Sequence, residues 1–244
     1  FTLEEFDKTK PLLTEKKSPS PPPFAIAREN ALVYQQVGND IYYLDNSGHL
    51  FKSKSASPSF LPSLSLRESS VNDERITSAP FPIRQGGARE TEYVLEIFQG
   101  SIFLRELNGD LYKFNPDLEV FENFFERINS LKISQDNKKL AYFSDYEIWI
   151  LFLSDKNDLP QKKAGEKLFL IRLSEKITDV FWLNSNYLIF GAGSKIKIAE
   201  IDDRDRINVA DLREFPNPQI FWTINKELFI LSEGNLYKSE EIIK

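Results

Sequence analysis

The sequence predicts an all-β protein, a β-propeller of four-stranded antiparallel blades with about five blades visible. Three observations support this prediction: a strand–turn–strand phrase that occurs five times, blade-like spacing between its copies, and the lack of a helical period. From residue 24 onward, short runs of β-branched and aromatic residues alternate with Asn, Asp, Gly and Ser, which is typical of strands and turns. No window keeps apolar residues at i, i+3, i+4 and i+7 over several turns.

The repeated phrase holds an apolar strand, a polar turn, and a second strand that begins with Leu or Ile, so each copy predicts a β-hairpin. The five copies are Asp40–Ser53, Ser101–Phe114, Lys139–Phe152, Tyr187–Glu200 and Glu227–Glu240. The first apolar residue after the turn recurs at steps of 61, 37, 48 and 40 residues. Three of these steps are close to the length of a four-stranded blade, about 40–50 residues.

Further apolar runs complete four strands per unit. These runs are Leu131–Ser134, Asp179–Leu183 and Gln219–Thr223 before a hairpin, and Lys167–Leu173 and Arg206–Leu212 after one. For Phe121–Lys132 we prefer an outer strand to a helical turn. A hairpin cannot bury both of its faces alone, so stacking such sheets around an axis is the natural way to form a continuous core. Five units fit a closed five-bladed ring or part of a larger ring.

The domain organisation follows from changes in composition. Residues 1–23 are expected to form an N-terminal extension and a Pro-rich linker, because the run Pro21–Pro23 favours extended polyproline geometry. Residues 24–244 are expected to form the β-propeller domain, with a long Ser- and Pro-rich insertion around 54–91. The first seven residues fit a short helix or a strand. Phe24–Ala27 is a candidate closing strand for the incomplete last unit.

The third unit, Leu131–Leu151, resembles the TolB-type and WD40-like propeller repeat. In that repeat an inner strand runs into a Ser-Pro-Asp-Gly turn, an apolar strand follows, and an Ile-Trp pair closes the unit. Here the turn is Ser134–Asn137, in which Gln replaces Pro and Asn replaces Gly, and the closing pair is Ile148–Trp149. Asn is the best substitute where the backbone must be left-handed.

The stretch 31–244 is also similar to the propeller portion of bacterial envelope proteins that join a PEGA-type domain to degenerate propeller repeats. This resemblance implies a noncatalytic scaffold that binds a protein or polysaccharide partner outside the cytoplasm, at the cell envelope. It also implies that this chain is the C-terminal part of a longer protein, with room for an upstream anchor. The alternative function is a propeller-type hydrolase, similar to a glycosidase, with two carboxylates in a central pocket.

Composition excludes several classes of function. Lys and Arg total 31 and Asp and Glu total 37, and no basic cluster stands out, so nucleic acid is not an expected partner. We interpret the pair Lys162–Lys163 as a solvated loop. The chain has no cysteine, which excludes disulfides and thiolate metal sites. The longest apolar runs, Ile148–Leu153 and Leu168–Ile171, are too short to cross a bilayer.

Two candidate sites are weighed against simpler interpretations. His49 is the only histidine, so a multi-histidine metal site or histidine relay is excluded, and we interpret it as a polar turn residue. The acidic cluster Asp202–Asp205 offers oxygen ligands for calcium, but Arg204 and the spacing argue against such a site. We therefore interpret this cluster as a solvated loop. No catalytic residue, cofactor or metal is predicted.

The hydrolase alternative depends on acids beside strands. The candidates are Asp40, Glu92, Asp145 and Asp179. None stands in a distinctive motif, and acids at such positions usually form turns or protect sheet edges. The segment Gly191–Gly193 lacks the third glycine of a dinucleotide-binding loop, so we predict a tight turn there.

The three tryptophans are expected to serve in packing rather than in ligand stacking. Trp182 and Trp222 each follow a Phe in the strand before a hairpin, so we predict that they pack between neighbouring blades. Trp149 stands in a closing strand and is predicted to cover the face of its own sheet.

Overall fold

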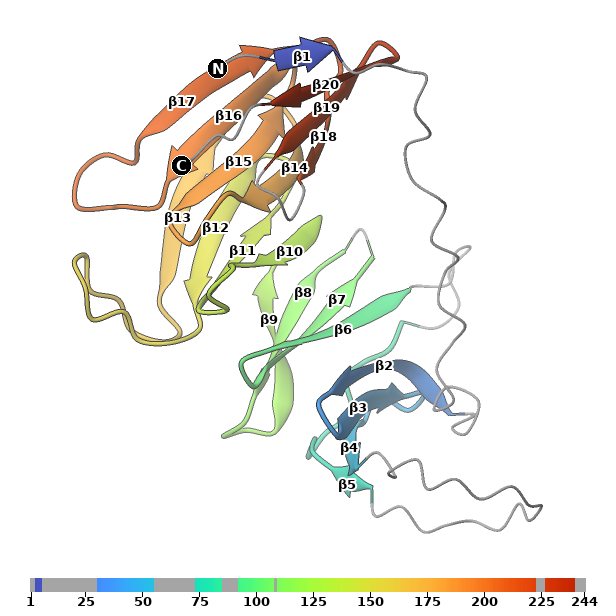
Figure 1. Ribbon diagram of the computed structural model, residues 1–244. Coiled ribbons are helices and arrows are strands. Elements are labelled where there is room, and N and C mark those ends of the chain that lie inside the picture. The colour runs from blue at the N-terminus through green and yellow to red at the C-terminus, as the bar shows by residue number, and fades with distance from the viewer. Residues whose placement is uncertain are drawn as a thin grey trace. The chain divides into compact units, whose positions relative to one another are not determined.

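The computed structural model describes residues 3–5, 30–54, 73–84, 92–107, 109–222 and 227–239. Within these ranges every regular element is a β-strand, and the strands form five four-stranded antiparallel sheets (Figure 1). In four of the sheets the strands follow one another along the chain, which is the strand order of a propeller blade. The predicted all-β propeller architecture and all five predicted hairpins are confirmed.

The chain forms two compact units. Unit 1 consists of residues 1–16 and 128–244, and unit 2 consists of residues 17–127. Unit 2 contains two of the sheets and unit 1 contains three. No helix in the described ranges is long and apolar enough to cross a bilayer.

Unit 2 is built from two sheets that share one core. The first sheet contains β2 (Ala31–Val37), β3 (Asp40–Asp45), β4 (Leu50–Lys54) and β5 (Glu74–Arg75). The second contains β6 (Tyr93–Phe98), β7 (Ser101–Glu106), β8 (Leu111–Asn115) and β9 (Val120–Phe125). Phe81, from the segment expected as an insertion, is buried in this core and meets the rings of Tyr93, Tyr112 and Phe121 edge-on. Part of that segment is therefore an element of the core.

Unit 1 is built from three sheets. The first contains β10 (Ser130–Ile133), β11 (Lys139–Phe143), β12 (Glu147–Phe152) and β13 (Lys167–Arg172). The second contains β14 (Ile177–Trp182), β15 (Tyr187–Ala192), β16 (Lys195–Glu200) and β17 (Val209–Glu214). The third contains β18 (Gln219–Trp222), β19 (Leu228–Ser232), β20 (Asn235–Ser239) and β1 (Leu3–Glu5). One apolar core lies between the first and second sheets, and another lies between the second and third. The strand predicted at Arg206–Leu212 begins three residues later, at Val209.

The last sheet joins the two ends of unit 1. Strand β1 pairs antiparallel with β20, with Leu3 opposite Ser239 and Glu5 opposite Tyr237 (Figure 1). Of the two alternatives left open for the first seven residues, the strand is the one found. Phe24–Ala27, the candidate closing strand, lies outside the described residues, and β1 takes the edge position beside β20.

The turn predicted from the TolB-type resemblance is formed as expected. Asn137 has a left-handed backbone with φ of 57°, and the Ser134 hydroxyl donates to the Asp136 carboxylate at 2.5 Å. Gln135, which stands where the repeat has Pro, donates its side-chain amide to the carbonyl of Leu183 at 3.2 Å. The substitution of Pro by Gln thus gives this turn a hydrogen bond to the residue that follows β14 of the neighbouring sheet.

The repeated phrase also produces a repeated hydrogen-bond pattern in unit 2. In the turns Asp45–His49 and Glu106–Asp110, the N–H of the first residue donates to the carbonyl of the fifth at 2.9 and 3.0 Å. The N–H of the fourth residue, a glycine, donates back to the carbonyl of the first at 3.0 and 3.1 Å. Equivalent residues of the two repeat copies therefore form the same backbone hydrogen bonds.

Two glycines in the first sheet provide a test of this turn. Both have positive φ, 60° at Gly38 and 88° at Gly48, but a Cβ at Gly48 would lie 2.1 Å from the carbonyl oxygen of Phe81, whereas a Cβ at Gly38 would meet nothing. We expect Gly38→Ala to cost only the left-handed backbone penalty, about 1–2 kcal/mol, and Gly48→Ala to cost clearly more. Urea unfolding of the two variants measures the difference. Equal midpoints would show that the Phe81 segment does not pack on this turn.

Candidate functional site

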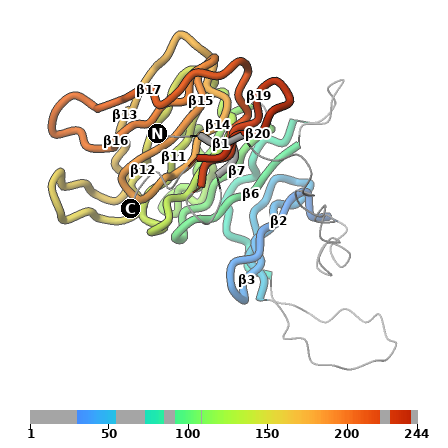
Figure 2. The backbone as a smooth tube through the Cα atoms, turned by 45° about the horizontal axis from the view of Figure 1, so that its top comes forward, coloured from blue at the N-terminus to red at the C-terminus, as the bar shows by residue number. Residues whose placement is uncertain are grey.

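The two longest connections of unit 1 lie at the same end of their sheets. They are the β12–β13 connection, residues 153–166, and the β16–β17 connection, residues 201–208, and both views show them projecting on the same side (Figures 1 and 2). A pocket of about 290 Å³ lies there, which we call the loop-end pocket. Its lining residues are Phe152, Lys156, Asp158, Leu159, Pro160, Asn186, Tyr187, Glu200, Ile201 and Asp202.

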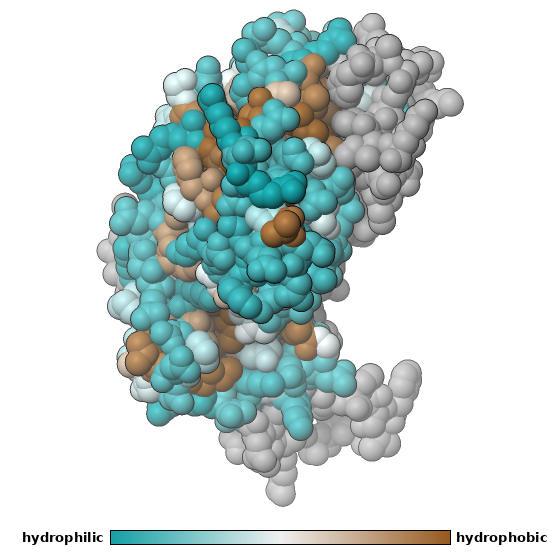
Figure 3. Space-filling model, turned by 90° about the vertical axis from the view of Figure 1, so that its left-hand side faces the viewer, coloured by the Kyte–Doolittle hydropathy of each residue, from teal (hydrophilic) through white to brown (hydrophobic). Residues whose placement is uncertain are grey.

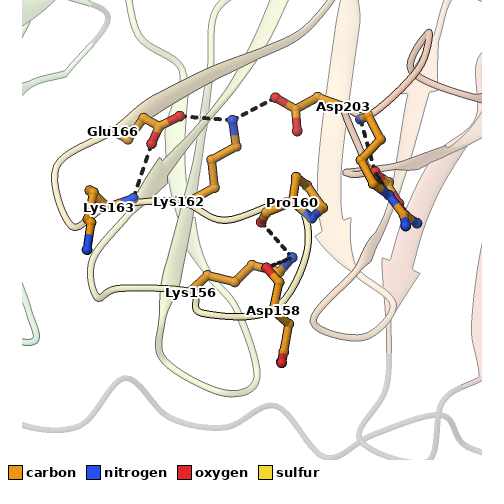
Figure 4. A network of polar contacts seen from close by, with 9 residues as sticks. Lys156, Asp158, Pro160, Lys162, Lys163, Glu166 and Asp203 are labelled. Atoms are coloured by element: carbon orange, nitrogen blue, oxygen red, sulfur yellow. Dashed lines mark hydrogen bonds and ion pairs between the residues drawn. The ribbon is translucent and has the colours of Figure 1, made fainter.

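Hydrogen bonds within the β12–β13 connection give it a fixed shape. The backbones of Lys156 and Lys162 pair in both directions, at 2.8 and 3.0 Å. The Lys156 ammonium donates to the carbonyl oxygens of Asp158 at 3.1 Å and Pro160 at 2.9 Å (Figure 4). The tip between these bonds carries Leu159, which is 73% exposed. The connection therefore holds an apolar side chain in solvent on an ordered base.

An ion pair joins the two connections. The ammonium of Lys162, which is partly buried, lies 2.7 Å from the carboxylate of Asp203 and 2.9 Å from that of Glu166 (Figure 4). Hydrogen bonds to Asp203 and Glu166 raise the pKa of Lys162, so the lysine stays charged. We expected Lys162–Lys163 to be a solvated loop, and for Lys162 this interpretation is wrong. Its partner Asp203 is 41 residues away in the sequence, which local inspection does not reveal.

Two acids of the loop-end pocket, Glu200 and Asp202, accept hydrogen bonds from neighbouring side chains. Glu200 accepts a hydrogen bond from the Tyr187 hydroxyl at 3.1 Å. Side-chain and backbone hydrogen bonds from Arg204 lower the pKa of Asp202 to about 2. An acid catalyst at neutral pH needs a raised pKa, so Asp202 is suited to holding a negative charge rather than to donating a proton. Among the described lining residues, the three carboxylates of Asp158, Glu200 and Asp202 outnumber the single ammonium, that of Lys156.

The acidic cluster Asp202–Asp205 thus contributes to the site through protein contacts. Asp202 binds Arg204 and Asp203 binds Lys162. One oxygen of Asp203, Oδ1, is buried without a hydrogen-bond partner. In the part of the chain that the structure describes, no group of three or more His, Cys, Asp or Glu side chains is placed to hold a metal ion.

His49 lies in the turn between β3 and β4 of unit 2, as predicted. Its backbone N–H donates to the Asp45 carboxylate at 2.8 Å, and its Nδ1 lies 3.2 Å from the hydroxyl of Thr77. The ring therefore meets a neutral hydroxyl, which suits a polar turn residue.

Two of the four acids of the hydrolase alternative, Asp40 and Asp145, form ion pairs with lysines. Asp40 forms an ion pair with Lys52 at 2.9 Å, and Asp145 forms one with a lysine ammonium at 3.1 Å. Glu92 is exposed just before β6, and Asp179 is partly buried within β14. None of the four lines the loop-end pocket.

The tryptophans pack as predicted where the structure describes them. Trp182 is buried in the core between the first and second sheets of unit 1, and its Nε1 donates to the carbonyl of Lys132 on β10 at 2.7 Å. Trp149 stacks on Tyr142 of its own sheet at 6.4 Å between ring centroids. The side chain of Trp222 lies outside the described residues, so its predicted burial stays a prediction.

The tight turn predicted at Gly191–Gly193 is only partly correct. Gly191 and Ala192 belong to β15, and the turn begins at Gly193, whose φ is 58°. A Cβ at Gly191 would lie 2.4 Å from the Thr178 hydroxyl on β14. Gly191 is therefore a strand residue that lies close to the side chain of Thr178, and the sequence spacing does not distinguish this position from a turn.

The comparisons with known proteins find similar solved structures but no similar sequence of known function. No family model matches the chain, and no curated protein matches its sequence. Among solved structures, it is similar to YCF48 from Cyanidioschyzon merolae (12% identity, 85% of this chain and 66% of that chain, TM-score 0.46). It is also similar to the Cps50 (Swd1) β-propeller domain of Myceliophteria thermophila (9% identity, 84% and 68%, TM-score 0.42). A third neighbour is streptogramin B lyase (9% identity, 85% and 64%, TM-score 0.45).

The chain thus spans about two thirds of the length of these three neighbours. One of these neighbours is named as a lyase and another as a β-propeller domain. The structural similarity therefore does not show whether this chain is an enzyme or a binding protein. The propeller architecture itself follows from the order of strands in the sheets.

Proposed function

We propose that this chain is a noncatalytic β-propeller scaffold and that the loop end of unit 1 binds a protein partner. The observation that carries this proposal is the ordered β12–β13 connection, which holds Leu159 in solvent beside the loop-end pocket. Loops on a rigid β scaffold are common places for binding.

The energetics of the connection favour binding. Burying one exposed leucine stabilises a complex by about 1.5–3 kcal/mol. Because ion pairs and backbone hydrogen bonds already fix the connection, little conformational entropy is lost when a partner binds. An exposed leucine suits an apolar depression on a protein better than a polysaccharide, whose surface is covered with hydroxyl groups. The excess of carboxylates in the pocket favours a basic surface around that depression.

We further propose that this binding takes place at the bacterial cell envelope. The resemblance to TolB-type repeats and to the propeller portion of PEGA-domain proteins supports this location. Recovery of the full-length gene and fractionation of its product would test it. A product found only in the cytoplasmic fraction would contradict the proposed location and leave the binding surface unaffected.

Leu159→Ser is expected to weaken partner binding by about tenfold or more, because it removes the exposed apolar contact. Leu118→Ser is the matched control, since Leu118 is also exposed, at 58%, but lies in unit 2. Both variants should melt like the parent protein. The measurement is the affinity of a partner identified by cross-linking in the native organism. Equal binding by both variants would contradict the proposed surface, and turnover of a glycoside panel by the parent would contradict a noncatalytic role.

A further inference from the structure

We propose that unit 1 carries a second binding surface, a groove between β13 and the start of β17 that binds an extended acidic segment of a partner protein. The groove has a volume of about 710 Å³. Its lining residues are Phe169, Leu170, Ile171, Arg172, Arg206, Ile207, Asn208 and Val209. None of them lines the loop-end pocket, so this surface goes beyond the function proposed above.

Five of the eight described residues that line the groove are apolar. Leu170 is buried at its base, and Ile171, Ile207 and Val209 pack against the edge of the core between the first two sheets. Phe169 is 44% exposed and its ring packs edge-on against Trp149 at 4.9 Å, which fixes its position. Figure 3 views the molecule from the side on which β13 and β17 lie in Figure 1, and hydrophobic residues there lie between hydrophilic ones.

The charge of the groove selects the occupant. The chain as a whole has a net charge of −6, yet the described residues of the lining include two arginines and no acid. Arg206 is exposed, and Arg172 is exposed and paired with Glu147. The Arg172 side chain is 73% exposed whereas Glu147 is 16% exposed, so a partner carboxylate can reach further N–H donors of Arg172 while its pair with Glu147 stays in place. A guanidinium binds a carboxylate through two parallel hydrogen bonds, which favours an acidic occupant.

The backbone selects the conformation of the occupant. Strand β13 pairs with β12 on one side and, in the described part of the chain, with no strand on the other. Such an edge presents N–H and C=O groups to an added strand, and proteins usually protect it with Lys, Pro or a charged side chain pointing inward. In β13 the charged residues Lys167 and Arg172 stand only at the two ends, and between them the strand presents the exposed ring of Phe169. An extended segment added to β13 would direct alternate side chains into the groove and toward the arginines.

The probes are fluorescent eight-residue peptides that alternate leucine with glutamate or leucine with lysine. Anisotropy titration with the full chain is expected to show binding of the acidic peptide and not of the basic one. Arg172→Ala combined with Arg206→Ala should weaken this binding by about tenfold or more. Arg213→Ala is the matched control, because Arg213 is an exposed arginine of β17 outside the groove. If Arg213→Ala weakens peptide binding as much as the double variant does, the peptide is held by nonspecific charge attraction and the proposed groove is wrong.

Two further measurements complete the test. An acidic peptide with methylated backbone nitrogens cannot donate to an edge strand, so it should lose binding, and unchanged binding would overturn strand addition. Leu159→Ser should leave peptide binding unchanged. Failure of the acidic peptide to bind, with partner binding still sensitive to Leu159→Ser, would overturn the groove and leave the proposed function intact.

Discussion

Replacing Trp182 by Ala is expected to lower the free energy of unfolding by about 3–5 kcal/mol. Trp182 is 5% exposed and lies in the core that joins the first two sheets of unit 1. Truncation would leave a cavity between these sheets and would remove the hydrogen bond from the indole to the carbonyl of Lys132 on the neighbouring sheet. An effect of this size is a large fraction of the stability of a typical domain.

Two variants separate the components of this effect. Trp182→Phe keeps most of the aromatic volume but leaves the Lys132 carbonyl without its donor, which should cost about 1–3 kcal/mol. Trp149→Ala should cost less than Trp182→Ala, since Trp149 is only partly buried on its own sheet. Urea unfolding should be followed by circular dichroism, because removal of a tryptophan changes the fluorescence signal itself. If Trp182→Ala unfolds at the same urea concentration as the parent, the indole does not hold the two sheets together.

Replacing Asp136 by Ala is expected to lower the free energy of unfolding by about 2–3 kcal/mol. The side chain of Lys139 is only 7% exposed, and the Asp136 carboxylate is its ion-pair partner at 2.8 Å. Removing one partner of a buried ion pair usually costs about 3–5 kcal/mol, because the other charge stays buried and unpaired. The expected value is lower here because the Asp136 side chain is 29% exposed.

Two comparisons test this explanation. The double variant Asp136→Ala with Lys139→Met should recover part of the lost stability, because it removes the unpaired charge as well. Asp155→Ala should change stability little, since the pair that Asp155 forms with Lys163 is exposed on both sides. Equal losses from Asp136→Ala and Asp155→Ala would contradict the role of Lys139 burial.

The pH dependence gives an independent measurement of the same pair. Burial alone raises the pKa of Asp136, but hydrogen bonds from Lys139, Ser134 and the Lys138 backbone outweigh it and lower the pKa to about 2. The lowered pKa means that ionised Asp136 stabilises the fold above about pH 4, and that this contribution is lost as the pH falls toward 2. The parent should therefore lose stability across this range more steeply than Asp136→Ala does.

The sequence predicted the elements whose signals are local. Each hairpin was recognisable because alternating apolar residues and turn residues lie within about 14 neighbouring positions. Asn137 could be assigned a left-handed backbone because its side chain is suited to that geometry. In contrast, the position of Leu3–Glu5 beside β20 and the burial of Phe81 depend on contacts with distant segments. Such contacts leave no periodic trace in a single sequence.

The candidate site was predicted less completely than the fold. Asp202–Asp205 stood out as an acidic cluster, but its role depends on Lys162, which was interpreted as solvated. Leu159 carries no motif, and its importance comes from its exposure on an ordered tip. The groove at Phe169 lies between two edge strands from different sheets, so the sequence of either strand alone does not predict it.

The pairing of β1 with β20 has a consequence for biosynthesis. Unit 2 is one continuous stretch of sequence, so both of its sheets can form as soon as that stretch has left the ribosome. The last sheet of unit 1 has to wait, because Leu3–Glu5 are translated long before their partners in β20. A nascent chain stalled before residue 235 would leave β19 with an open edge, to which a strand from another nascent chain can bind.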